Sequence, residues 1–264
     1  MERQSARGAD RRDDVARMTL LDEARQALER GDHEAVIGLT DALLAERPGD
    51  DAAHEYRARA LLALDRLDEA ERHAQDAVRL DPDEIRYREL LAEVFSRRGA
   101  HRDAAAEFGR LARNDPRQTT WTLAEARERL GAAQPAMGVE AAQRAVQLEP
   151  RNGRAQLALS QALAHIGDAR GAFQAAGAAL RLLGGAPEAR EALADARWLG
   201  NDDETAFEEF RSLANELTGA DGDRVVAKAR TLYRQHAGWG GRVVAGTGPL
   251  FAFAFRRGWL YVAR

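Results

Sequence analysis

The chain contains few residues whose type and spacing could support catalysis. It has no cysteine, so neither a disulfide nor a thiolate-ligated metal is available to it. The histidines are scattered, none stands in an HExxH or related zinc spacing, and most are expected on helix surfaces or in turns: His33, His54, His73, His101, His165 and His236. No nucleophile–base pair can be nominated. We therefore expect a protein that is not an enzyme and that carries no metal or cofactor.

One glycine-rich stretch invites comparison with a phosphate-binding loop. It runs from Gly238 to Gly248, but no Gly-Lys-Ser/Thr follows it, no strand is expected before it and no helix clearly begins there. Phosphate binding at this stretch is therefore weakly supported.

Charge is distributed unevenly along the 264 residues. The net charge is −4, yet Asp223 is the last acidic residue and the 41 residues after it carry eight basic side chains. The first 223 residues therefore sum to −12, which would repel nucleic-acid phosphates, so no nucleic-acid partner is expected. The sequence holds no apolar run long enough to span a bilayer, and Met1 to Asp14 has no apolar core of a secretory signal. These features predict a cytoplasmic protein.

The elements that position these residues follow a 34-residue repeat. Four prolines stand 34 residues apart, at positions 48, 82, 116 and 150, and six units beginning at residue 17 stay in register to residue 220. With the proline as position 32, positions 8, 20 and 27 are small or aliphatic in every unit. Position 8, for example, reads Ala24, Ala58, Ala92, Ala126, Ser160 and Ala194.

Each unit reads as two amphipathic helices joined by a turn. Apolar residues recur at helical spacing before and after position 15, where turn-forming residues predominate. The proline ends the second helix because it disfavours helical geometry in the residue before it and cannot donate a backbone hydrogen bond. Asp83 and Asn152, which follow prolines, are expected to cap the next helix.

This pattern resembles the tetratricopeptide repeat (TPR) family, in which a 34-residue helix–turn–helix carries small residues at positions 8 and 20 and proline at position 32. The resemblance covers residues 17–220, although position 4 is never aromatic and position 24 is aromatic only at Phe108 and Phe210. It implies an all-α, right-handed solenoid of six repeats. The fourth repeat departs most from the pattern, with Arg129 at position 11 and Gly138 at position 20, and is expected to be the least stable.

The expected organisation has four parts. Residues 1–16 are predicted to be a disordered charged arm, 17–220 the six repeats, 221–237 a solvating helix and 238–264 a separate basic, aromatic segment. The last segment could complete the core, lie on an anionic membrane surface or dock into a groove. The residues expected to contact a membrane or partner are Trp239, Phe251, Phe253, Phe255, Arg256, Arg257 and Trp259.

The resemblance also implies a concave groove lined by first-helix positions 2, 5, 9, 12 and 13. Six of these positions hold arginine: Arg25, Arg59, Arg86, Arg97, Arg127 and Arg154. The arginines could bind carboxylates of an acidic or C-terminal peptide, or pair with neighbours such as Glu55, Glu89 and Glu93. The Lys and Asn that the family uses at positions 5 and 9 to grip a chaperone's terminal carboxylate are absent.

The sequence therefore favours a non-catalytic scaffold or adaptor that binds a partner peptide or helix in the groove. A peripheral membrane adaptor attached through 238–264 is the main alternative, and a nucleic-acid-associated protein using the basic segment is a weaker one. The oligomeric state stays open.

Overall fold

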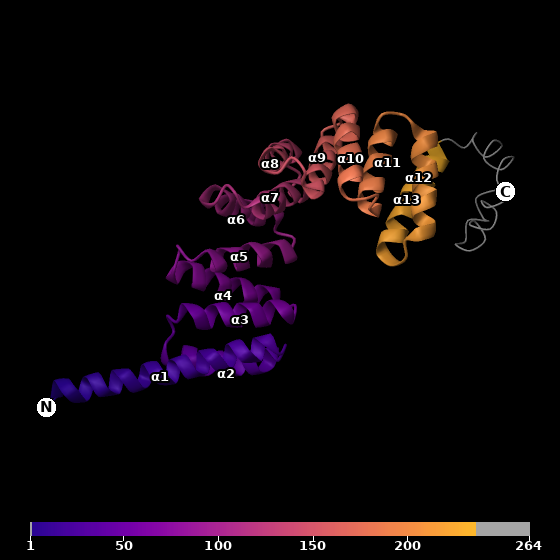
Figure 1. Cartoon of the computed structure of the whole chain (residues 1–264). Coiled ribbons are helices and arrows are strands. Elements are labelled where there is room, and N and C mark those ends of the chain that lie inside the picture. The colour runs from indigo at the N-terminus through magenta and orange to yellow at the C-terminus, as the bar shows by residue number, and fades with distance from the viewer. Residues whose placement is uncertain (1, 236–264) are drawn as a thin grey trace. The chain divides into compact units, whose positions relative to one another are not determined.

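The computed structural model of the chain describes residues 2–235, and the side chains of residues 14–235. These residues form thirteen α-helices and no strand (Figure 1). The chain divides into two compact units at Gln134/Pro135, inside the fourth repeat. The first unit contains α1 Glu2–Glu29, α2 His33–Glu46, α3 Asp51–Ala63, α4 Leu67–Leu80, α5 Ile85–Arg97, α6 His101–Asn114 and α7 Thr119–Gly131. The second contains α8 Pro135–Leu148, α9 Gly153–His165, α10 Ala169–Leu182, α11 Pro187–Leu199, α12 Asp203–Glu216 and α13 Gly219–Gln235.

The helix boundaries keep the 34-residue period of the sequence. The first helices of repeats two to six begin at residues 51, 85, 119, 153 and 187, and the second helices of all six repeats begin at residues 33, 67, 101, 135, 169 and 203. The predicted all-α repeat architecture is therefore confirmed, and every helix of the repeats except α1 begins at the same position of its unit.

The small side chains at positions 8, 20 and 27 lie where helices pack closely. All of them are buried in all six repeats, and the alanines at positions 8 and 20 are fully enclosed or nearly so. A larger side chain at these positions would push the two backbones apart, because protein interiors are close-packed. The burial confirms the repeat register.

Polar residues just before the first-helix N-termini accept hydrogen bonds from the free backbone N–H groups of the first turn. Asn152 caps α9, because its side-chain oxygen accepts hydrogen bonds from the backbone N–H groups of Arg154 and Ala155 at 2.9 and 3.3 Å. The expectation that Asp83 caps α5 is wrong, because α5 begins one residue later and Glu84 is its cap. Glu84 accepts from the backbone N–H of Arg86 at 3.4 Å.

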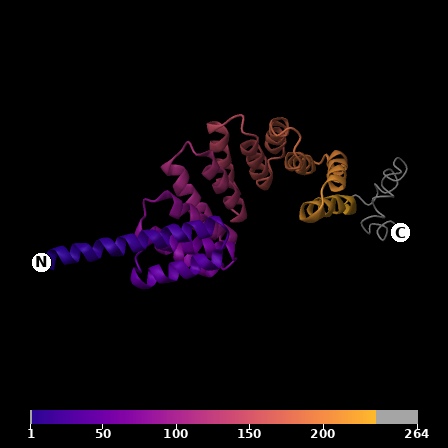
Figure 2. The same ribbon diagram turned by 60° about the horizontal axis from the view of Figure 1, so that its bottom comes forward.

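The core of the first unit runs between successive helix pairs. Leu61, Leu90 and Val94 are almost completely buried and pack with alanines of α3 and α4. Figure 2 shows α1 running past the helices that it packs against, with its N-terminal half extending beyond them.

The start of α1 differs from the predicted disorder of residues 1–16. The helix begins at Glu2, and no proline interrupts the sequence before Pro48. Two ion pairs attach the middle of α1 to the loop after α2: Asp14 accepts from Arg47 at 3.0 Å, and Arg17 pairs with the buried Asp50. These contacts favour the helical conformation where the charged composition alone favours disorder.

The last helix of the second unit covers the end of its stack. Val225, Val226 and Leu232 of α13 are buried against Phe207 and Phe210 of α12. Polar contacts add to this apolar packing, because Arg224 and Lys228 of α13 bind carboxylates on α11. The predicted helix over 221–237 corresponds to α13, which begins two residues earlier.

The basic aromatic segment 238–264 lies outside the described residues. So do the side chains predicted there to contact a membrane or partner: Trp239, Phe251, Phe253, Phe255, Arg256, Arg257 and Trp259. Within residues 2–235, no helix is both long enough and apolar enough to cross a membrane.

Candidate partner-binding surface

The arginines predicted to line the groove all lie on first helices, but in two separate units. Arg25 is on α1, Arg59 on α3, Arg86 and Arg97 on α5 and Arg127 on α7, whereas Arg154 is on α9 of the second unit. Their role in binding a partner stays a prediction, and their surroundings can be described.

Five of the six arginines have carboxylate partners close by. The nitrogen–oxygen distances are 2.9 Å for Arg25–Glu29, 2.9 Å for Arg59–Glu55, 3.5 Å for Arg86–Glu55, 2.9 Å for Arg97–Asp65 and 2.8 Å for Arg127–Glu128. Arg154 is exposed at the start of α9. The surface of the first unit therefore carries paired charges of both signs rather than a purely basic track.

Glu55 is a buried carboxylate shared by two of these arginines. Its side chain is 3% exposed, and its Oε1 accepts a hydrogen bond from Nε of Arg59 on the same helix. Its Oε2 has no hydrogen-bond donor and is 3.5 Å from Nε of Arg86 on the next first helix. Because a buried carboxylate needs a compensating cation, Glu55 holds Arg59 and Arg86 in place.

Glu128 of α7 is a second buried carboxylate that orients an arginine, Arg127. It accepts hydrogen bonds from Ser96 at 2.8 Å, from His101 at 2.7 Å and from Arg127 at 2.8 Å. Burial alone would raise the pKa of Glu128, but these three donors hold that pKa below its ordinary value. The carboxylate is therefore ionised near neutral pH and orients Arg127.

Glu89 and Glu93 do not serve as the predicted arginine partners. Glu89 instead accepts a hydrogen bond from Nε1 of Trp121 at 2.6 Å, linking the first helices α5 and α7. Glu93 is exposed on α5. Of the three proposed neighbours, only Glu55 is paired with arginines of the predicted track.

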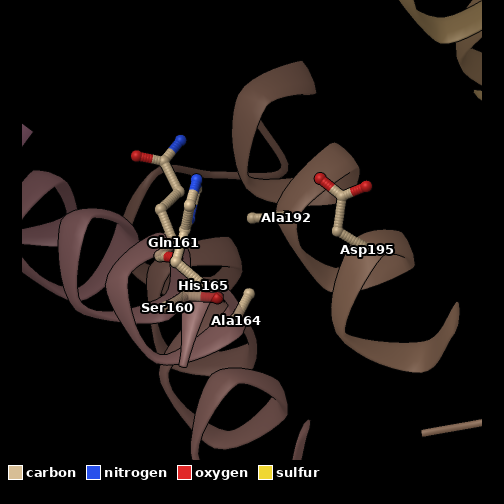
Figure 3. Close-up of a pocket in the computed structure, with 6 residues that line it drawn as sticks. All are labelled: Ser160, Gln161, Ala164, His165, Ala192 and Asp195. Atoms are coloured by element: carbon tan, nitrogen blue, oxygen red, sulfur yellow. The ribbon is translucent and has the colours of Figure 1, made fainter. Parts of the chain in front are cut away.

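The second unit has a cavity on its first-helix face. It has a volume of about 260 Å³ between α9 and α11. Figure 3 shows the lining side chains, which are Ser160, Gln161, Ala164 and His165 of α9 with Ala192 and Asp195 of α11. These α9 residues occupy positions 8, 9, 12 and 13 of their repeat, three of which the resemblance assigns to a groove.

The cavity has small walls and a polar rim. Ser160 donates its hydroxyl hydrogen to the carbonyl oxygen of Ala172 at 2.9 Å, so this hydroxyl is used inside the repeat. Gln161 and His165 are exposed at the edge. Across the opening, Asp195 accepts from Nζ of Lys228 at 2.6 and 2.7 Å. The arrangement can hold a small apolar side chain and offer hydrogen bonds around it.

The same lysine belongs to a network that fixes α13. Glu191 of α11 accepts from Nε and Nη2 of Arg224 at 3.0 and 2.7 Å and from Lys228 at 2.9 Å. Burial alone would raise the pKa of Glu191, but these donors lower it below its ordinary value. Two of the eight basic residues after Asp223 are thus neutralised within the fold.

His54 is an exception among the histidines, most of which were expected on helix surfaces or in turns, because it is only 6% exposed. It contacts His73, whose pKa is lowered to about 4 by burial and by the nearby Arg57. Sequence spacing could not have indicated this pair, because the two residues are 19 positions apart on different helices.

Comparison with known proteins gives matches to repeat proteins. A family model described as tetratricopeptide repeat matches residues 21–94. The "Inactive TPR repeat-containing thioredoxin TTL3" of Arabidopsis thaliana is 37% identical over 75 residues, which are 28% of this chain and 11% of that protein. The chain thus spans only about a tenth of the length of this curated relative.

Solved structures share the fold at low sequence identity. A tetratricopeptide repeat protein from Parabacteroides merdae ATCC 43184 has a TM-score of 0.72 at 13% identity, over 89% of this chain and 94% of that one. YrrB, described as a TPR protein with an unusual peptide-binding site, has a TM-score of 0.55 at 17% identity, over 73% of this chain and 97% of its own. MamA AMB-1 has a TM-score of 0.56 at 12% identity, over 64% and 99%. Together with the 34-residue period of the helix pairs, these matches show that the chain shares the fold of tetratricopeptide repeat proteins.

Proposed function

We propose that this protein is a non-catalytic scaffold that binds a partner peptide or helix on the first helices of its repeats. The match to the tetratricopeptide repeat model and the fold shared with tetratricopeptide repeat proteins support a scaffold that binds other proteins. YrrB is described as having a peptide-binding site, which supports the same class of function here without defining the ligand.

The observation that carries this proposal is the cavity between α9 and α11. Its walls include Ala164 and Ala192, and its edge includes Gln161 and His165 (Figure 3). A small apolar side chain of the partner would enter between the alanines, where removal of apolar surface from water favours binding. The amide and imidazole at the edge would then hydrogen-bond the partner's backbone.

The proposal predicts that filling the cavity abolishes binding. Ala164→Phe places a large side chain in the space that the partner would occupy, whereas Gln174→Phe adds the same ring at an exposed position of the second helix α10. Peptides selected from a displayed random library against the full chain serve as the probe, and their affinity is measured by fluorescence anisotropy. We expect at least a tenfold loss for Ala164→Phe and little change for Gln174→Phe.

Two outcomes would contradict this assignment. One is a selected peptide set that binds Ala164→Phe as tightly as the unmodified chain, which would move the site elsewhere. The other is failure of selection to yield any peptide specific for the folded chain. Far-UV circular dichroism of both variants establishes that neither result comes from unfolding.

The paired arginines of the first unit are proposed as a secondary recognition surface. Arg59 and Arg86 are held by the buried Glu55 and are still 37% and 47% exposed. Each therefore retains N–H groups that could donate to a partner carboxylate. Replacement of Arg86 by Gln would then weaken acidic peptides selectively and leave neutral ones unchanged.

A second candidate function is attachment to an anionic membrane through 238–264. Four of the eight basic residues after Asp223 lie in this segment, together with six aromatic residues and no acidic residue. Co-sedimentation with vesicles of anionic rather than neutral lipid tests it. Binding to anionic vesicles should fall when Arg256 and Arg257 are replaced by Gln. Equal binding to neutral vesicles would contradict membrane attachment through this segment.

A cytoplasmic location stays a prediction.

A further inference from the structure

Three potential metal ligands converge in the second repeat. His54 projects from α3, and His73 and Asp76 lie one helical turn apart on α4. The Nδ1 atoms of the two histidines are 2.9 Å apart, and Oδ2 of Asp76 is 3.9 Å from Nδ1 of His54. The three ligand atoms all lie within 4.8 Å of one another.

Hydrogen bonds to neighbouring groups leave a lone pair free on Nδ1 of His54 and on Oδ2 of Asp76, facing the centre of the cluster. Nε2 of His54 is 3.0 Å from the carbonyl oxygen of Pro48. Because a carbonyl oxygen can only accept, Nε2 carries the proton and Nδ1 presents its lone pair. A metal-binding histidine is typically oriented in this way, by donation of its other N–H to a backbone carbonyl or carboxylate.

Asp76 is oriented similarly. Its Oδ1 accepts from Nη2 of Arg79 at 2.8 Å, which leaves Oδ2 to face His54. Two further cations, Arg57 and Arg72, lie close to the pair. Arg57 pairs with Asp41, and Nε of Arg72 donates to the carbonyl oxygen of Asp68 at 3.4 Å. The carboxylate of Asp76 is therefore the negative charge that would compensate a bound cation.

The hydrogen bond between the two imidazoles occupies the position that a metal ion would take between their Nδ1 atoms. Since Nδ1 of His54 is unprotonated, His73 must donate its Nδ1–H to it across the 2.9 Å contact. If His73 moves its proton from Nδ1 to Nε2, both Nδ1 atoms become ligands without a net loss of protons. Two Zn–N bonds of about 2.0–2.1 Å in tetrahedral geometry require nitrogens about 3.3 Å apart, so the rings need to separate by only a few tenths of an ångström.

We propose that His54, His73 and Asp76 form a binding site for a divalent transition metal, with Zn²⁺ as the ion that their donors suit best. Two imidazole nitrogens and one carboxylate oxygen are donors that Zn²⁺ accepts in a four-coordinate site. Three protein ligands leave the fourth position for water or for a side chain of a bound partner. The half-burial of His73 and Asp76 gives that position access to solvent.

The test uses the full chain without an affinity tag, treated with chelator and returned to metal-free buffer. Titration with Zn²⁺ is followed by calorimetry, and Co²⁺ serves as an absorbing substitute whose spectrum reports four-coordinate geometry. We expect about one equivalent per chain. We expect His73→Gln and Asp76→Asn to weaken binding at least about tenfold, since even outer-shell changes cost about 10–100-fold in metal sites.

The control is His165→Gln, which removes an exposed histidine of the second unit. It should leave the affinity unchanged. The proposal is overturned if the unmodified chain binds no Zn²⁺, if both ligand variants bind as the unmodified chain does, or if His165→Gln weakens binding as much as they do. Should His73→Gln fail to fold, Asp76→Asn decides the question alone, because Asp76 is only half-buried.

A second readout separates binding at this site from weak surface association. Zn²⁺ bound between α3 and α4 stabilises the folded state, so it should raise the thermal midpoint of the unmodified chain in a concentration-dependent way. The Asp76→Asn variant should show a smaller rise at the same Zn²⁺ concentration. Equal rises in both proteins would contradict the assignment of Asp76 as a ligand.

Discussion

The turn inside each repeat places its fifteenth residue in the left-handed backbone region. Three repeats have glycine there, Gly31, Gly99 and Gly167, with φ of 74°, 74° and 82°. The fourth has Ala133 with φ of 54°. For an L-residue with a Cβ atom this conformation costs about 1–2 kcal/mol, whereas glycine adopts it freely.

We predict that Ala133→Gly stabilises the protein. Relief of the left-handed strain, about 1–2 kcal/mol, is offset in part by the greater freedom of glycine in the unfolded chain, about 0.4–1 kcal/mol. The turn closes with hydrogen bonds from the N–H of Ala133 to Leu130 at 3.0 Å and from the N–H of Gln134 to Arg129 at 2.8 Å, both of which glycine retains. The expected net gain is about 1 kcal/mol.

The assay is urea denaturation followed by far-UV circular dichroism, with the thermal midpoint as a second measure. Gly99→Ala is the reciprocal change, and an added Cβ there meets no atom within 4 Å, so it tests the backbone effect alone. It should destabilise by about 1 kcal/mol. Ala132→Gly, at the adjacent residue with φ of −78°, adds flexibility without relieving strain and should also destabilise.

A urea midpoint lowered by Ala133→Gly, as expected for Ala132→Gly, would refute backbone strain at Ala133. An unchanged midpoint for Gly99→Ala would refute it as well. Because repeat proteins can unfold in stages, the midpoints are compared only if the slopes of the transitions agree.

Three further changes test the packing and the charge network. Ala92→Phe, at a fully enclosed position 8, should destabilise by about 1–3 kcal/mol through overpacking, and an unchanged thermal midpoint would contradict the repeat register. Phe210→Ala should cost about 3–5 kcal/mol in urea denaturation, because the ring is fully buried beneath α13; a cost below 1 kcal/mol would contradict that packing. Glu191→Gln should cost about 1–2 kcal/mol at pH 7, discounted for the partial exposure of Arg224 and Lys228, and the deficit should disappear in acid.

The acid dependence of Glu191→Gln follows from the lowered pKa of Glu191. Because the folded state holds that pKa below the ordinary value of 4.5, the ionised carboxylate contributes stability above pH 4.5 that is lost as the pH falls below it. The stability difference between the two proteins should therefore shrink below pH 4.5. Glu188→Gln, an exposed change one turn earlier on α11, is the control and should cost less than Glu191→Gln at pH 7. A deficit that persists unchanged in acid would contradict the role given to the charge.

Much of the fold could be predicted because it is repeated. A small residue at one position is weak information, but Ala58, Ala92 and Ala126 at equal spacing define a register, and their burial bears it out. The helix after the repeats was predictable from its apolar face, which packs on Phe207 and Phe210.

The sites were less accessible to sequence reasoning. The cavity depends on Ala164 and Ala192, which the sequence does not distinguish from its many other alanines. Its volume comes from the spacing between α9 and α11. The pairing of His54 with His73 depends on two helices meeting, with no short spacing to mark it. The expectation of disorder for residues 1–16 rested on the charges of the segment and took no account of contacts such as that of Asp14 with Arg47.

The main packing contacts within each unit join a helix to the next helix along the chain, or to the next but one. Such contacts close short loops, so the relative contact order is low and each step loses little chain entropy before its contacts form. Folding should consequently be fast, able to begin in more than one repeat and to spread to its neighbours. During synthesis, a repeat could pack as soon as its second helix emerges, so that the apolar face awaiting the following repeat is exposed only briefly.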